Sequence, residues 1–325
     1  MTDHKATVLV TGATGNTGSR VAARLAALGH TVKAATRHRA ETATRHPATA
    51  QDDGLRDSAQ DDGLRDSAQN AVRPVRFDWD DPATFDGALR GTDRIYLVPP
   101  IGATDPAAVM LPFLARARAT GVRRVVLLSS SAIPAGGPAV GQVHEALAGM
   151  PGEWAVLRPS WFMQNFTGPR QHADTIRRDD VIMTATDEGR VGFIDADDIA
   201  AVAVHALTDE TAPNTDLVIT GPQALSYAEV AATVGHVTGR PVRHRPLTYE
   251  QMRDRLAVGI PAEFAALLAG LDRAIAEGAE DRVTPTVEEV TGRPPRSFAD
   301  FAAAHAADWT PHPPSEAGGA LGGAL

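Results

Sequence analysis

A glycine-rich pattern near the amino terminus could hold the phosphates of a dinucleotide. The segment Thr11 to Gly18 reads TGATGNTG and directly follows an apolar run, Ala6 to Val10. Gly12 permits a tight turn, Gly15 lets the backbone approach a pyrophosphate, and Gly18 allows close packing of helix and strand. Backbone N–H groups at the helix start would then point at the phosphates. The expected cofactor contacts here are Gly12, Thr14, Gly15, Asn16, Thr17 and Gly18.

The end of the second predicted strand indicates which dinucleotide to expect. An NAD-binding fold usually has an Asp or Glu about twenty residues past the glycines, where it binds the ribose hydroxyls. Here the strand Thr31 to Ala35 is followed by TRHR at Thr36 to Arg39, without an acid. The Arg37 guanidinium suits a 2′-phosphate through a bidentate contact, so we expect NADP(H). A solvated basic loop is the alternative.

Other cofactor contacts are expected where later strands end. Asp78, with Trp79 beside it, follows the third strand and could receive the adenine amino group. Asp78 could equally cap the helix that begins at Pro82. Pro99 and Ser129 follow two further strands and are expected on the nicotinamide side.

The elements that must position these residues alternate between short apolar runs and amphipathic stretches. Val21, Leu25 and Leu28 have helical spacing and Gly29 ends that helix, whereas Tyr227 to Thr238 predicts another. The fold class is α/β, a doubly wound parallel Rossmann sheet with a smaller, mainly helical C-terminal substrate lobe. The expected division is an NADP-binding domain at 1–160, completed by about 190–221, a substrate lobe at 161–189 and 222–308, and a disordered tail at 309–325.

A direct repeat interrupts the first domain, since Gln51 to Ala59 recurs unchanged as Gln60 to Ala68. We interpret it as a duplication in a surface connection, where added length has little thermodynamic cost. An acidic docking arm is the alternative.

Composition excludes several classes of function. The 325 residues contain no cysteine, and the eleven histidines form no HExxH-like pair, so a metal centre is not expected. A net charge of -9 would repel a nucleic acid backbone. Because no apolar run is long enough to span a bilayer and no signal peptide is present, we expect a cytoplasmic monomer or homodimer whose partner is a small-molecule substrate.

Four segments carry a family resemblance that extends over roughly Ala6 to Phe301. They are TGATGNTG, LVPP at Leu97 to Pro100, VVLLSSSA at Val125 to Ala132 and LRPSWFMQNF at Leu157 to Phe166. With these segments the chain resembles the atypical short-chain dehydrogenases/reductases of the NmrA-like, NAD(P)H-binding family, and within them the ergot-alkaloid reductase branch of the festuclavine synthase type. The resemblance implies an NAD(P)H-dependent oxidoreductase.

The usual proton relay of such reductases is absent. Ketone-reducing members use a YxxxK pair, but no tyrosine here has a lysine at that spacing. His144 stands about thirteen residues after Ser131 and could donate the proton, with Ser130 as the other candidate catalytic residue. A helix-surface histidine without chemistry is the alternative. Without an acid, the substrate should be an iminium, a quinone or an enone, which accept hydride unaided.

Bulky side chains after Arg158 and Pro159 are expected to line the substrate pocket, although such a run could also be core. These residues are Trp161, Phe162, Met163, Gln164, Asn165 and Phe166. The sequence thus predicts an NADPH-dependent reductase, with a role in secondary metabolism as one possibility. A dinucleotide-sensing regulator without turnover and a non-redox cyclase or isomerase on the same scaffold remain alternatives.

Overall fold

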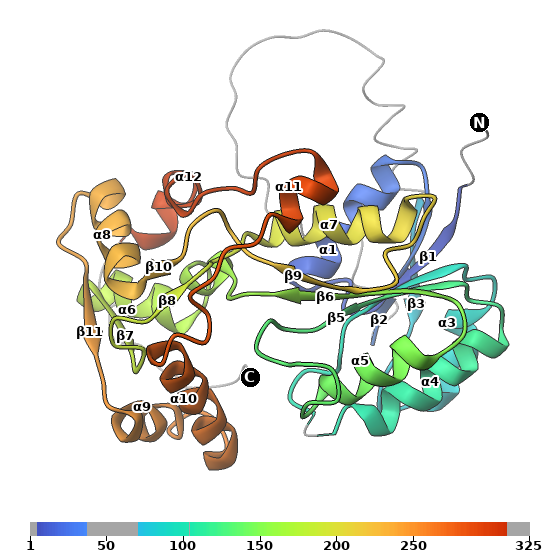
Figure 1. Cartoon of the computed structure of the whole chain (residues 1–325), viewed down its shortest axis with the longest axis horizontal. Coiled ribbons are helices and arrows are strands. Elements are labelled where there is room, and N and C mark those ends of the chain that lie inside the picture. Colours follow the sequence, from blue (N-terminus) through green and yellow to red (C-terminus); the bar gives the residue numbers. More distant parts are fainter. Residues whose placement is uncertain (1–4, 38–70, 104, 311–325) are drawn as a thin grey trace, which may run out of the picture. The chain divides into compact units, whose positions relative to one another are not determined.

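The computed structural model describes residues 5–37, 71–103 and 105–310. Contacts divide the chain into two compact units, whose elements are labelled in Figure 1. Unit 1 comprises residues 1–160, 194–220 and 284–295, and unit 2 comprises residues 161–193, 221–283 and 296–325. In the described part, no helix is both long and apolar enough to cross a bilayer. The direct repeat at 51–68 and residues 311–325 of the expected tail lie outside the described residues.

Unit 1 contains a seven-stranded parallel sheet, which confirms the expected doubly wound fold. The strand order is β3-β2-β1-β4-β5-β6-β9, so the direction of winding reverses between β1 and β4. That reversal is the switch point at which such sheets bind dinucleotides. The strands are β1 (Thr7–Val10), β2 (Thr31–Thr36), β3 (Val72–Arg76), β4 (Arg94–Leu97), β5 (Arg124–Leu128), β6 (Glu153–Pro159) and β9 (Asp216–Ile219).

Helices cover both faces of this sheet (Figure 1), and its central strands β1, β4 and β5 are largely buried. On one face, Phe113 and Leu147 pack with Leu9, Leu127 and Val156, all of which are fully buried. Burying each such side chain contributes about 1.5–3 kcal/mol. That face carries α3 (Phe85–Leu89), α4 (Ala107–Ala119) and α5 (Val140–Gly149), and the other carries α1 (Asn16–Ala27), α7 (Ala196–Thr208) and α11 (Thr286–Thr291).

Helix α1 follows its predicted pattern except at the last position. Val21 and Leu25 are fully buried, whereas Leu28 is 56% exposed. The expectation for Leu28 was wrong because the helix ends at Ala27 and Leu28 is its C-cap. Gly29 then takes a φ of 82°, which ends the helix as expected.

A buried cation joins the sheet to α7. The Arg124 side chain is 1% exposed, and its Nε donates to Glu153 Oε2 at 2.7 Å. Its Nη1 donates to the carbonyls of Ala206, Leu207 and Asp209, at the carboxyl end of α7. The guanidinium therefore binds carbonyls that the helix leaves unpaired and complements its dipole. The hydrogen bond from Arg124 also lowers the pKa of the Glu153 carboxyl.

One segment belongs to a different unit from the one expected. Residues 284–295 were placed in the substrate lobe, but they pack in unit 1. The reason is a set of hydrogen bonds from two threonines to β9 and to Thr220 just after it. Thr284 N donates to Thr220 Oγ1 at 2.8 Å. The hydroxyls of Thr284 and Thr286 both donate to Val218 O.

Unit 2 is mainly helical and has its own core. Phe166, Phe193, Tyr227 and Phe298 pack ring against ring at its centre. Two helices begin with complete capping boxes, which satisfy their first N–H groups. The helices are α6 (Gln171–Asp179), α8 (Tyr227–Thr238), α9 (Tyr249–Leu256), α10 (Ala262–Ala276) and α12 (Phe298–Ala304). Strand β7 (Val181–Thr184) pairs with β11 (Arg243–Pro246), and β8 (Arg190–Val191) with β10 (Leu225–Ser226).

The start of the expected tail is ordered instead. A 3-10 helix covers Ala306–Trp309, and Trp309 is fully buried. Its indole Nε1 donates to Phe166 O at 2.6 Å. The prediction that the tail begins at residue 309 was therefore wrong, because this indole fills the core of unit 2.

We expect Arg124→Met to lower the free energy of unfolding by about 3 kcal/mol, since it leaves buried carbonyls unpaired. In a unit of this size that corresponds to a fall in melting temperature of roughly 6–12 °C. Thermal and urea denaturation of the full chain would measure it. The matched control is Arg123→Met at the exposed neighbouring position. Equal losses in the two variants would contradict a special role for Arg124.

Candidate functional site

The glycine turn lies at the switch point of the sheet, between the carboxyl ends of β1 and β4. Thr11, the first residue after β1, joins the two strands: its N–H donates to Tyr96 O at 3.0 Å. Val98 N donates to Thr11 Oγ1 at 2.6 Å. The turn therefore leaves the sheet from a fixed point, and Pro99, half-buried, follows Val98 at the same edge.

The glycines are required by close contacts within the turn. Gly12 has a φ of 61°, a conformation that favours glycine. A Cβ on Gly18 would stand 2.2 Å from Gly12 O, and a Cβ on Gly15 would stand 3.2 Å from that oxygen. Helix α1 thus packs directly on the turn, at a distance that no other residue type at position 18 permits.

The start of α1 presents backbone N–H groups to a ligand. Gly15 is the N-cap and offers no side chain, and the first turn contains no acidic residue. Both features suit an anion, because neither a capping oxygen nor a carboxylate competes for the helix N-terminus. Thr14 is exposed and Asn16 half-buried, whereas Thr17 is 4% exposed, so Thr17 could offer a ligand only its backbone.

Arg37 stands one residue after β2, the strand beside β1. Its side chain is exposed, and no acidic side chain of the described residues pairs with it. Arg37 therefore remains the predicted contact for a 2′-phosphate. Arg39 lies outside the described residues.

Asp78 does not cap the helix at Pro82. Asp81 takes that role, because its Oδ1 accepts from Ala83 N at 3.2 Å. Asp78 Oδ1 instead accepts from Asp80 N, within the loop after β3. Helix capping by Asp78 is therefore excluded, and the half-buried Asp78 remains a predicted adenine contact.

Trp79 is half-buried and packs on aromatic neighbours. Its ring meets those of Phe77, Phe85 and Phe113 at centroid distances of 4.9, 6.1 and 5.3 Å. These contacts fix the indole in the core beneath the loop. A cofactor could touch only its remaining accessible surface.

Two serines form the turn after β5. Ser129 N donates to Leu157 O at 2.7 Å, and its buried hydroxyl has no hydrogen-bond partner among the described residues. Ser130 Oγ accepts weakly from Ala132 N at 3.3 Å. The structure thus brings two hydroxyls to the carboxyl end of the sheet, where the sequence placed the nicotinamide.

Arg158 holds this turn in place, a role that sequence reasoning missed. Its Nη2 donates to Ser131 O at 3.0 Å and its Nε to Ser130 O at 3.4 Å. Its Nη1 is paired with Asp216 Oδ2 at 2.7 Å. The fork of the guanidinium therefore connects the serine turn to the start of β9. The arginine stands in the LRPSW segment, but nothing near it in sequence identifies Asp216 as its partner.

His144 is a buried residue of α5 rather than a surface one. It is 4% exposed, and its Nδ1 has no hydrogen-bond partner among the described residues. Burial is the main reason that the pKa of the imidazole is lowered, and Arg158 lowers it further, while Asp216 and Glu145 act in the opposite direction. Near pH 7 the ring is therefore mostly neutral and poorly suited to donate a proton.

The expected substrate contacts after Pro159 divide into two groups in unit 2. Met163 and Phe166 are fully buried, so their assignment to a pocket wall was wrong. Both lie in the 3-10 helix Met163–Phe166 and point into the aromatic core of that unit. Gln164, at 7% exposed, is also buried. Trp161, Phe162 and Asn165 are half-buried and remain predicted substrate contacts.

Together, the parallel sheet, its switch point and the uncapped helix start define a Rossmann-type dinucleotide-binding protein. Comparison with known sequences agrees. The NAD(P)H-binding family matches residues 12–210, and the NmrA-like family matches residues 142–299.

Individual relatives cover most of the chain. It is 44% identical to the uncharacterized oxidoreductase YesF of Bacillus subtilis (strain 168), over 93% of this chain and 96% of that protein. It is 41% identical to agroclavine dehydrogenase of Claviceps fusiformis, over 69% of this chain and 81% of that protein. The structure of Citrobacter sp. triphenylmethane reductase covers 92% of this chain and 99% of its own, with a TM-score of 0.71 at 20% identity. The chain therefore belongs to the NmrA-like, NAD(P)H-binding family and is an NAD(P)H-dependent oxidoreductase.

Replacing Gly18 with alanine should weaken NADPH binding at least about ten-fold, or ~1.4 kcal/mol, because the added Cβ separates helix from turn. Isothermal titration of folded protein would measure this. Gly87→Ala is the matched control, since a Cβ there meets no atom within 4 Å. Wild-type affinity in the Gly18→Ala protein would show that the phosphates bind elsewhere.

Proposed function

We propose that this protein is an NADPH-dependent reductase that transfers hydride to an electrophilic small molecule, such as an iminium, a quinone or an enone. One observation carries the proposal. The turn after β5 offers two serine hydroxyls, and the nearest histidine in sequence, His144 of α5, packs beside Trp154 with an imidazole that burial keeps neutral. Such a site favours acceptors that need no enzymic acid. The names of two similar proteins, agroclavine dehydrogenase and triphenylmethane reductase, support an organic substrate.

In this proposal the chain acts mainly by positioning. The N–H groups at the start of α1 hold the pyrophosphate, and Arg37 holds the 2′-phosphate. Ser129, Ser130 and Pro99 orient the nicotinamide, and Arg158 keeps the serine turn rigid. When bound, NADPH supplies the hydride. Orientation of the two reactants then lowers the barrier.

The proton balance differs between acceptors but never requires a protein acid. Hydride addition to an iminium carbon gives a neutral amine directly. Addition to a quinone or an enone gives a delocalised anion, which water can protonate. An unactivated ketone would form a localised alkoxide, and general acid catalysis worth about 10² to 10⁴-fold would be missing.

A substrate screen followed by NADPH absorbance tests the proposal, with imines, quinones, enones and simple ketones in the panel. We expect turnover of the first three classes and little of the fourth. Cofactor binding without any turnover would favour a regulator instead. Conversion of a substrate without NADPH consumption would favour a cyclase or isomerase.

The exposed Arg37 predicts a preference for NADPH over NADH. A charge-assisted contact with the 2′-phosphate should contribute ~1.5–3 kcal/mol, or at least about ten-fold in affinity. Arg37→Ala should remove that preference while NADH affinity stays within about two-fold. Arg73→Ala, an exposed arginine of β3, is the matched control. Equal affinities for the two cofactors in the wild type would refute the assignment of Arg37.

The buried, neutral His144 predicts a small effect of its removal on chemistry. His144→Gln should change turnover of a quinone by less than about three-fold, and cofactor affinity should be unchanged. A loss near 10²-fold with binding intact would identify His144 as the acid. In that case the rate in the wild type should also fall as the pH rises through the lowered pKa of His144, because its protonated form disappears.

A further inference from the structure

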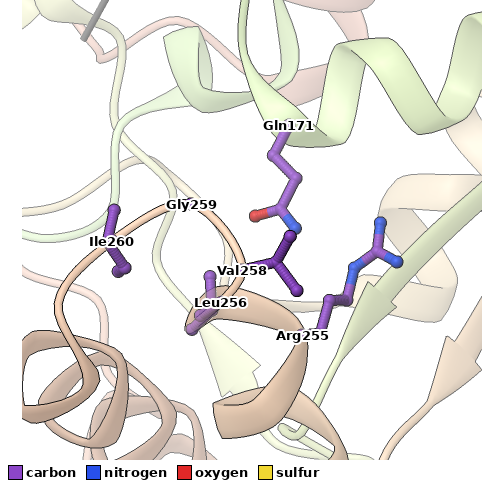
Figure 2. A pocket seen from close by; sticks show the side chains of 6 residues that line it. All are labelled: Gln171, Arg255, Leu256, Val258, Gly259 and Ile260. Carbon is purple, nitrogen blue, oxygen red and sulfur yellow. The ribbon is translucent and has the colours of Figure 1, made fainter.

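Unit 2 contains a pocket of about 590 Å³, a size suited to a small molecule. It lies between the start of α6 and the segment that follows α9. Figure 2 shows the side chains that surround it: Gln171, Arg255, Leu256, Val258, Gly259 and Ile260.

The wall formed after α9 is apolar and poorly covered. Val258 is 91% exposed, although a valine gains free energy from burial. Leu256 and Ile260, on either side of it, are only half-buried. An apolar ligand in the pocket would remove this surface from water.

Arg255 is the one charged residue among the residues that line the pocket. Its Nε is buried without a hydrogen-bond partner in the described part of the chain. Two other arginines with a buried Nε have partners: Arg20 Nε lies 3.2 Å from Asp197 Oδ2, and Arg118 Nη1 donates to the carbonyls of Val122 and Arg123. Within the described ranges, Arg255 makes no hydrogen bond or ion pair through any of its nitrogens. A buried N–H without an acceptor is costly, so the Nε of Arg255 indicates a missing partner.

The surroundings of Arg255 do not supply that partner. In Figure 2 the Gln171 amide extends into the same space, where it can donate a second hydrogen bond. His172, the next residue, is neutral near pH 7, because burial and the nearby charges of His244 and Arg255 lower its pKa to about 4. Asp254 is paired with Arg253 on the same helix. Among the described residues, the pocket therefore presents a single positive charge without a paired carboxylate, beside an apolar wall.

We propose that this pocket binds a small molecule with an apolar, ring-sized body and an anionic carboxylate or sulfonate group. The anion pairs with Arg255 and accepts a hydrogen bond from Gln171, while the body covers Val258.

A fluorescent probe that cannot accept hydride tests the pocket apart from catalysis. The probe is 1-anilinonaphthalene-8-sulfonate, and N-phenyl-1-naphthylamine is its uncharged counterpart. Arg255→Met should weaken sulfonate binding at least about ten-fold while affinity for the amine stays within about two-fold. Arg253→Met, two residues earlier on α9, is the matched control and should change neither. Val258→Asp should weaken both.

Each outcome separates the pocket from the reductase. Unchanged sulfonate affinity in both the Arg255→Met and the Val258→Asp proteins would overturn the proposed site, even if quinone turnover were found. Equal losses for the two probes in Arg255→Met would overturn the anion contact. Sulfonate binding that depends on Arg255, in a protein that turns over no acceptor, would support the pocket and contradict only the reductase.

Discussion

The close contact between α1 and the glycine turn is the constraint on which the cofactor site depends. Because a Cβ on Gly18 would meet Gly12 O at 2.2 Å, the helix can approach the turn only when position 18 is glycine. That approach places the first N–H groups of α1 beside the end of β1, at the switch point of the sheet. Without it, the same sheet could form but would offer no concentrated set of donors to a pyrophosphate.

Local sequence was sufficient for most of the elements of unit 1 because its central strands β1, β4 and β5 are largely buried on both faces. Such strands appear as short apolar runs that need no knowledge of their partners. Helix α8 was predicted with its observed bounds, and the structure shows what sets them: Ser226 and Glu229 form a capping box, and Gly239 ends the helix with a φ of 67°. The prediction that Leu28 lies on the buried face of α1 was wrong because periodicity alone does not show where a helix ends.

Sequence could not predict the contacts whose partners lie far away along the chain. Asp216 is 58 residues from Arg158, and Thr284 is 66 residues from Val218. The assignment of Met163 and Phe166 to a pocket wall was wrong for a related reason, because sequence alone does not distinguish an apolar side chain of a pocket wall from one of a core. The glycine turn, by contrast, was recognised because all of its residues are consecutive, so their spacing carries the geometry.

The arginines of the chain show how structural and ligand-binding charges can be distinguished. Arg124 and Arg158 are largely buried, and each guanidinium is occupied by carbonyls and a carboxylate, so they stabilise the fold. Arg37 is exposed at the end of β2, where water solvates its charge, and it is the residue for which we propose a phosphate contact. Arg255 combines burial of its Nε with the absence of partners in the described residues. No carboxylate of the described residues pairs with it, which supports the anionic ligand that we propose for this pocket.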